Sequence, residues 1–146
     1  TPDSLKLKTS FNGIEIDPIT YKVAKTLYSK VNLRNRGFED TNYESNHDMV
    51  IGNPPYGKYK NKYSSYFSKP KMHQIELFFM YYGLQLLKPG GLMVYLTGSN
   101  FLRNGITYQT EKAELEKVCD ILDAYRLPPV FKFSQVPTDI IVLKRK

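Results

Sequence analysis

The chain has 146 residues and a mass of 16.9 kDa, the size of one ordinary domain. Its 41% hydrophobic and 24% charged residues exclude a disordered tail, a collagen-like fibre and a low-complexity linker. No stretch approaches the roughly 20 apolar residues that a membrane-spanning helix needs, so no membrane partner is expected. The single cysteine, Cys119, cannot form an internal disulfide, which indicates a reducing, cytoplasmic location. The net charge of +7 favours a polyanionic partner.

The first third of the chain predicts a strand, a helix and a second strand. The first strand is expected near residues 11–16, and Asp17-Pro18 then supplies an N-cap followed by proline in the first turn, a strong helix start. The helix continues to about residue 29 with one apolar face, formed by Ile19, Val23, Leu27 and Tyr28. A weaker strand is predicted around residues 31–38, where Asn and Arg interrupt the apolar pattern.

The middle of the chain predicts another strand, helix and strand. Residues 48–52 predict a short buried strand, which ends at Asn-Pro-Pro-Tyr-Gly because that sequence continues neither a strand nor a helix. Apolar residues at helical spacing from Ile75 onwards predict a helix, and Lys-Pro-Gly-Gly at 88–91 is expected to close it. Residues 92–97 predict a central strand.

The last third predicts a polar loop at residues 98–110, a short helix at 111–118, and strands at 120–127 and 138–144. The connection between these two strands is too short for a helical crossover, which favours an antiparallel pair. Because strands and helices alternate along the chain, we expect an α/β fold with a mostly parallel sheet.

The tetrapeptide Asn53-Pro54-Pro55-Tyr56 is the most informative stretch of the sequence. It follows a predicted strand, at the edge where open α/β sheets bind ligands. The two prolines fix the backbone and remove two N–H donors, so the Asn53 side-chain oxygen and the Pro54 carbonyl can both accept hydrogen bonds from one NH₂ group. Tyr56 adds a flat face. The pattern predicts a site for a planar group with an exocyclic amine, and the alternative is a rigid turn with an Asn cap.

Four motifs together resemble the S-adenosylmethionine-dependent adenine-N6 DNA methyltransferases of restriction-modification and related defence systems. The Asn-Pro-Pro-Tyr tetrapeptide is similar to the target-amine motif of this family, and residues 13–18 resemble its second motif, an acidic residue at a strand end. Residues 87–91 resemble the approach to its fifth strand, and residues 126–141 resemble its eighth motif with a base-stacking aromatic. The resemblance implies a Rossmann-like methyltransferase fold with an antiparallel C-terminal strand, and direct methyl transfer without a covalent enzyme intermediate.

The resemblance also assigns residues to the cofactor, S-adenosylmethionine. Glu15 would accept hydrogen bonds from the two ribose hydroxyls, and Ile16 would pack on the adenine ring. This family often has a further acid that receives the cofactor's adenine amine. Glu39 and Asp40 are equally placed for that role, and the alternative for either is a solvated carboxylate. The alternative for Glu15 is a strand-end carboxylate in water. This chemistry calls for neither a general base nor a metal ion.

The resemblance implies an adenine-containing DNA duplex as the substrate, with the target base flipped out of the stack. Tyr56 and Phe131 would stack on the two faces of the base; Phe133 is a rival for the second role, and core packing is the alternative for either Phe. The loop at residues 58–71 contains five Lys, no Asp or Glu and four aromatic residues, which suits either a DNA-contacting loop or a solvated lid. Its first three lysines are Lys58, Lys60 and Lys62.

One family motif has no counterpart here. The Gly-rich cofactor loop normally precedes the acidic residue by about twenty positions, and no glycine occurs before residue 13. We therefore expect residues 1–146 to form a single, partial catalytic domain that lacks the first strand and cofactor loop and works with the rest of a longer polypeptide or a specificity domain. Two other functions fit the motifs: methylation of a protein glutamine amide or an RNA base, and DNA binding by a catalytically silent relative.

Overall fold

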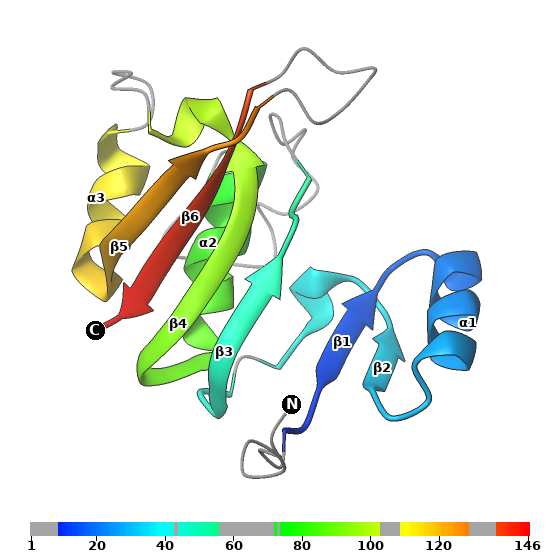
Figure 1. Ribbon diagram of the computed structural model, residues 1–146. Coiled ribbons are helices and arrows are strands. Elements are labelled where there is room, and N and C mark those ends of the chain that lie inside the picture. Colours follow the sequence, from blue (N-terminus) through cyan, green and yellow to red (C-terminus); the bar gives the residue numbers. More distant parts are fainter. Residues whose placement is uncertain (1–8, 43, 56–71, 73, 103–108, 129–136) are drawn as a thin grey trace, which may run out of the picture. The chain divides into compact units, whose positions relative to one another are not determined.

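The computed structural model describes residues 9–42, 44–55, 72, 74–102, 109–128 and 137–146 (Figure 1). The chain divides into two compact units, residues 1–42 and residues 43–146, and each unit is described by itself. No helix among the described residues is long and apolar enough to cross a membrane.

The N-terminal unit confirms the predicted strand, helix and strand. It contains β1 (Asn12–Glu15), α1 (Pro18–Leu27), β2 (Asn32–Asn35) and the short 3-10 helix η2 (Phe38–Asp40). Strands β1 and β2 pair in parallel, with Asn12 opposite Asn32 and Glu15 opposite Asn35. The pairing brings the ends of the two strands together, so the residues that follow Glu15 and Asn35 leave the sheet at the same edge.

Helix α1 begins where the sequence predicts, because Asp17 caps it. The Asp17 carboxylate accepts a hydrogen bond of 2.6 Å from the backbone N–H of Thr20, and this bonding lowers the pKa of Asp17. The predicted apolar face is present but exposed, since the residues Ile19, Val23, Leu27 and Tyr28 are each between 55% and 74% exposed. The described residues therefore leave this face uncovered.

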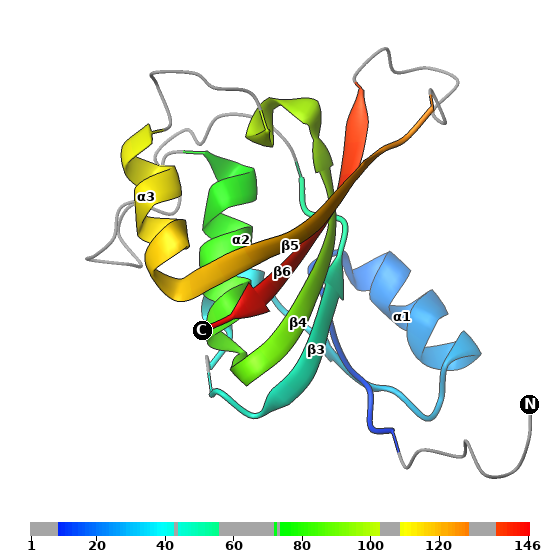
Figure 2. The ribbon, with the colours of Figure 1, turned by 60° about the vertical axis from the view of Figure 1, so that its left-hand side comes forward.

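The C-terminal unit contains β3 (His47–Gly52), α2 (Ile75–Gln85), β4 (Leu87–Gly98), η3 (Ser99–Phe101), α3 (Gln109–Val118), β5 (Cys119–Arg126) and β6 (Thr138–Arg145). The strands form one sheet in the order β3-β4-β6-β5. Strands β3 and β4 are parallel, and β6 is antiparallel to both β4 and β5, as predicted for the C-terminal pair. Helices α2 and α3 cover the same face of this sheet (Figure 2).

The core of this unit lies between the sheet and its two helices. Helix α2 is apolar on nearly every side, which is typical of a helix that is buried rather than amphipathic. The cluster of buried residues consists of Leu77, Met80, Leu84, Leu87, Met93, Tyr95, Phe101, Leu115, Cys119, Ile141 and Leu143. Residues near the carboxyl ends of β3 and β4, Val50 and Tyr95, pack in this core, so the core holds the two strand ends in place.

The prediction of a strand at residues 48–52 is confirmed, but the prediction that it is buried is wrong. Strand β3 lies at an edge of the four-stranded sheet, and only alternate side chains face the helices. Val50 packs against the core, whereas Met49 and Ile51 on the other face are 50% and 74% exposed. A continuous apolar run predicts burial on both faces, yet here the described residues bury one.

Residues 88–91 also differ from the prediction. Helix α2 ends earlier, at Gln85, and the Lys-Pro-Gly-Gly segment lies inside β4, where it forms a bulge against β3. The register moves there from His47 opposite Leu87 to Met49 opposite Leu92. Gly90 takes a φ of 81° in this bulge, a conformation that strongly favours glycine.

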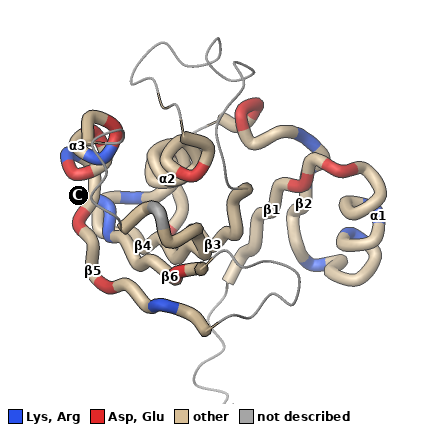
Figure 3. Tube along the Cα trace, turned by 90° about the horizontal axis from the view of Figure 1, so that it is seen from above, with Lys and Arg blue, Asp and Glu red and all other residues tan. Residues whose placement is uncertain are grey.

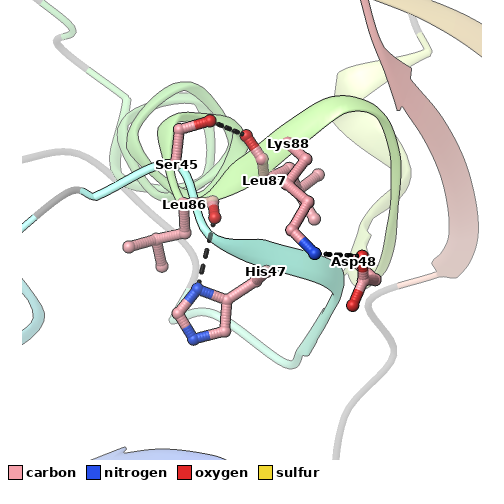
Figure 4. Close-up of polar contacts among 6 residues, drawn as sticks. All are labelled: Ser45, His47, Asp48, Leu86, Leu87 and Lys88. Atoms are coloured by element: carbon pink, nitrogen blue, oxygen red, sulfur yellow. Dashed lines mark hydrogen bonds and ion pairs between the residues drawn. The ribbon is translucent and has the colours of Figure 1, made fainter.

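Side chains from β3, from β6 and from Ser45 just before β3 hold the turn between α2 and β4. Ser45 Oγ donates a 2.6 Å hydrogen bond to the Leu87 carbonyl, and His47 Nδ1 lies 3.2 Å from the Leu86 carbonyl (Figure 4). Lys88 Nζ forms an ion pair of 2.7 Å with Asp48 across the bulge. Arg145 donates to the Gln85 carbonyl at 3.2 Å. The contacts made by Ser45, His47 and Arg145 satisfy carbonyl groups at and just after the end of α2, which lack intrahelical partners.

Candidate active site

The Asn-Pro-Pro segment lies where β3 ends. Gly52 is the last residue of the strand, and it pairs in register with Tyr95 of β4. Asn53 and Pro55 are exposed, whereas Pro54 between them is buried. The chain is therefore anchored at Pro54, next to the exposed residue Asn53. Tyr56 lies outside the described residues, as do Lys58, Lys60 and Lys62.

The aromatic ring of Tyr95 packs against this end of β3. Its side chain is 3% exposed, and a Cβ atom added to Gly52 would lie 2.9 Å from the ring atom Cε1. A Cβ added to Gly83 of α2 would lie 2.6 Å from Tyr95 Oη. Both glycines thus permit a close approach to one ring. Sequence reasoning missed this packing, because nothing in the sequence pairs residue 52 with residue 95.

An ion pair joins β5 and β6 at the end of the sheet where β3 and β4 finish. Asp139 is fully buried, and its carboxylate accepts hydrogen bonds from Arg126 Nε and, at 3.3 Å, from Arg126 Nη2. This bonding raises the pKa of Arg126 above its ordinary value. The sequence motif contained both residues, but their pairing follows only from the register of β5 against β6.

Backbone hydrogen bonds fix both ends of the connection between β5 and β6. The Ser99 N–H donates to the Pro137 carbonyl and the Leu127 N–H donates to the Thr138 carbonyl, each at 2.9 Å. The predicted stacking residue Phe131 and its rival Phe133 belong to this connection and lie outside the described residues. The structure describes the strand ends on either side of this connection, at residues 126–128 and 137–139.

The predicted cofactor carboxylate, Glu15, ends β1 and is partly exposed. Its Oε1 accepts a 2.7 Å hydrogen bond from the Asp17 N–H, and among the described residues its Oε2 accepts none. Asn35 holds the backbone here, since its Nδ2 donates to the carbonyls of Glu15 at 2.8 Å and Ile16 at 3.1 Å. Ile16 is 57% exposed. A carboxylate and an apolar side chain at neighbouring positions are therefore both accessible where β1 ends.

Glu39 and Asp40, the two candidates for the cofactor's adenine amine, differ in their surroundings. The Glu39 carboxylate folds back over Gly37, where its atoms lie 2.6–2.7 Å from the position that a Cβ of residue 37 would occupy. Asp40 is exposed. Both belong to the N-terminal unit with Glu15 and Ile16, whereas the Asn-Pro-Pro segment belongs to the C-terminal unit.

The positive charge of the chain is unevenly distributed along the sequence. Residues 58–71 alone contain five of its 21 Lys and Arg and none of its 14 Asp and Glu. The described residues carry twelve basic and thirteen acidic side chains, and both signs occur along α3 (Figure 3). No group of three or more His, Cys, Asp or Glu among the described residues could hold a metal ion.

Comparison with solved structures defines the class of fold. The chain superimposes on a Listeria monocytogenes protein assigned to the class I S-adenosylmethionine-dependent methyltransferases with a TM-score of 0.82 and 18% identity, covering 97% of this chain and 46% of that protein. A type I restriction-modification methyltransferase subunit from Streptococcus thermophilus superimposes with a TM-score of 0.78 and 24% identity, covering 94% of this chain and 34% of that one. The M protein of the type I restriction enzyme EcoKI superimposes with a TM-score of 0.72 and 20% identity, covering 92% of this chain and 31% of that one. The fold is that of a Rossmann-like methyltransferase.

The sequence itself identifies the family. Residues 9–131 match the family described as Eco57I restriction-modification methylase, and this chain belongs to that family. No curated protein matches the chain. The chain spans less than half the length of each of the three similar structures.

Proposed function

We propose that this chain is part of the catalytic domain of a DNA methyltransferase that transfers a methyl group to the N6 amine of a flipped-out adenine. Membership of a restriction-modification methylase family supports a DNA substrate. The observation that carries the finer assignment is the Asn53-Pro54-Pro55 segment at the carboxyl end of β3, with Pro54 buried and Asn53 exposed. The ends of parallel strands are where open α/β sheets bind ligands.

The proposed chemistry is mainly a matter of positioning. The lone pair of an adenine N6 amine is delocalised into the ring, so the amine is a poor nucleophile. The Asn53 side-chain oxygen and the Pro54 carbonyl would accept hydrogen bonds from its two hydrogens and turn the lone pair out of the ring plane, while Pro55 and Tyr56 complete the motif. Correct orientation of two reactants supplies several kcal/mol of a typical rate enhancement, about 7 to 11 at best. As the N–C bond forms, the bond between the methyl group and the sulfur of S-adenosylmethionine would break with its electron pair left on sulfur, and the amine would then give its extra proton to solvent.

The N-terminal unit would hold S-adenosylmethionine, which supplies an electrophilic methyl group when bound. Glu15 Oε2 has room to accept hydrogen bonds from ribose hydroxyls, and Ile16 offers an exposed apolar surface to an adenine ring. Glu39 or Asp40 would accept from the amine of that ring. Asn35 keeps the strand end in place through its two hydrogen bonds.

DNA would meet residues that follow the Asn-Pro-Pro segment in the sequence. Tyr56 and Phe131, or Phe133 in its place, would stack on the extruded adenine, a contact worth about 1 to 3 kcal/mol per base. Lys58, Lys60 and Lys62 would contact phosphates, which gives affinity without sequence choice. In this proposal residues 1–146 act as one partial catalytic domain of a cytoplasmic protein, with the rest of a longer polypeptide or a specificity domain choosing the DNA site.

The test is methyl transfer to an adenine-containing duplex by the whole protein and by two variants of residue 53. Asn53→Ala removes the side-chain acceptor and should lower transfer at least about 100-fold, as loss of a transition-state hydrogen bond does elsewhere. Calorimetric titration should show unchanged binding of S-adenosylmethionine. Asn53→Asp keeps an oxygen acceptor and should retain much of the activity. An active Asn53→Ala variant would overturn the assignment of the amine site.

The same assay separates the alternative substrates. Labelling of a protein glutamine or of RNA, with DNA unlabelled, would replace DNA adenine as the substrate while keeping the role of Asn53. DNA binding with a steep dependence on salt, combined with failure of the whole protein to bind S-adenosylmethionine, would identify a silent DNA-binding relative.

A further inference from the structure

The ring of Tyr95 is packed directly against the last residue of β3. Gly52 and Tyr95 are register partners in the parallel pair of β3 and β4. A Cβ on Gly52 would lie 2.9 Å from Cε1 and 3.4 Å from both Cδ1 and Cζ, so the ring occupies the space where any other residue would place its side chain. The position of this ring therefore sets how closely the backbone of Gly52 approaches the core.

Helix α2 approaches the hydroxyl end of the same ring. A Cβ on Gly83 would lie 2.6 Å from Tyr95 Oη and 3.4 Å from Cζ, which shows that the helix backbone also approaches the ring closely. Tyr95 Oη donates a hydrogen bond of 3.3 Å to the Phe79 carbonyl, one helical turn before Gly83. Burial raises the pKa of Tyr95, which keeps the hydroxyl protonated as a donor. Two glycine positions thus approach the ring closely, and its hydroxyl is hydrogen-bonded to α2.

We infer that Tyr95 is a positioning residue for the amine site, acting through Gly52 on Asn53 and the Pro54 carbonyl. This inference rests on the proposed function, which gives the Asn-Pro segment its task. Gly52 is covalently joined to Asn53, and Pro54 is buried, so a displacement of the Gly52 backbone is passed on to both acceptor oxygens. A shift of about 1 Å in a reacting group can lower a rate about 100-fold. Tyr95 itself touches neither substrate nor cofactor in this arrangement.

Two substitutions that correct one another test the inference. Gly52→Ala places a methyl group 2.9 Å from the ring, so either the ring or the strand end must move. We expect a loss in kcat of about 100-fold with little change in the KM for S-adenosylmethionine. Tyr95→Leu makes room for that methyl group, and the Gly52→Ala/Tyr95→Leu double variant should therefore be more active than Gly52→Ala alone. Gly98→Ala is the matched control, because no atom lies within 4 Å of the Cβ it would add.

A second measurement reports on position without any need for activity. The NMR resonances of the Asn53 backbone and side-chain amides should move in Gly52→Ala, return towards their original places in the double variant, and stay unchanged in Gly98→Ala. If the wild-type protein methylates no substrate but the variants show these shifts, the proposed function is refuted and the coupling of Tyr95 to Asn53 is supported. An active protein in which Gly52→Ala changes neither kcat nor the Asn53 resonances would overturn the inference and leave the proposed function standing. Equal losses in the single and double variants would also overturn it.

Discussion

Replacement of Leu84 by alanine is expected to remove a large part of the stability of the C-terminal unit. Leu84 lies in α2 with 0% of its surface exposed, in the cluster that also contains Tyr95. The substitution removes three carbon groups, each worth about 0.8 kcal/mol when buried, and leaves a cavity that adds roughly 1 kcal/mol. Alanine is as good a helix former as leucine, so helix propensity does not offset the loss. The expected decrease in the free energy of unfolding is about 3 to 4 kcal/mol.

Leu27→Ala in α1 is the matched control, because it makes the same chemical change at a helical position that is 68% exposed. We expect a change within about 0.5 kcal/mol, the usual range for a surface substitution. Urea unfolding of both variants, followed by circular dichroism and extrapolated linearly to water, measures the two values. A loss below about 1 kcal/mol at Leu84 would refute the buried position of α2. An equal loss at Leu27 would show that the apolar face of α1 is covered in the protein.

Two further predictions concern backbone conformation and thiol reactivity. Gly90→Ala should lower the free energy of unfolding by about 1 kcal/mol, because the φ of 81° strains any other residue although no atom blocks the added Cβ. Gly98→Ala is the control, since it has the same free space without the positive φ. Equal melting temperatures for the two variants would contradict the explanation. Burial raises the pKa of Cys119 to about 11, and the thiol is 5% exposed and donates to the Leu115 carbonyl at 3.3 Å. An aromatic disulfide reagent at pH 8 should therefore label the native protein much more slowly than the urea-unfolded protein, with a native rate that rises as the pH approaches 11. Equal rates in the two states would refute the burial of Cys119.

The elements could be predicted from the sequence, but their burial could not. Apolar spacing and the Asp17-Pro18 start identified α1, and the same spacing identified α2. Periodicity states which residues share a face, and it contains no information about what covers that face. For this reason the apolar side of α1 and the residues Met49 and Ile51 of β3 are exposed among the described residues, although their sequence pattern predicts contact with a core.

In the candidate site, too, some features could be predicted from the sequence and others could not. The position of Asn53 after a strand followed from Gly52 and two prolines, a local signal that needs no knowledge of the fold. Tyr95 and the Asp139–Arg126 pair could not be found like this, because each contact depends on the register between strands that are distant in sequence. Tyr95 appears in the sequence as one more apolar position of a central strand. Only the pairing with Gly52 reveals that its ring supports the end of β3.

The proposed function makes two demands that differ in their physical range, and different parts of the sequence meet them. Attraction of a phosphate backbone acts over about 10 Å at moderate salt and tolerates small errors in position. The sequence meets this demand with five lysines and no Asp or Glu between positions 58 and 71. Orientation of an amine fails over about 1 Å and therefore needs a rigid, close-packed support. Gly52, Tyr95 and Gly83 provide such a support beneath Asn53, in a unit whose described charges nearly cancel. Affinity for DNA and accuracy of methyl transfer should accordingly respond to separate sets of substitutions.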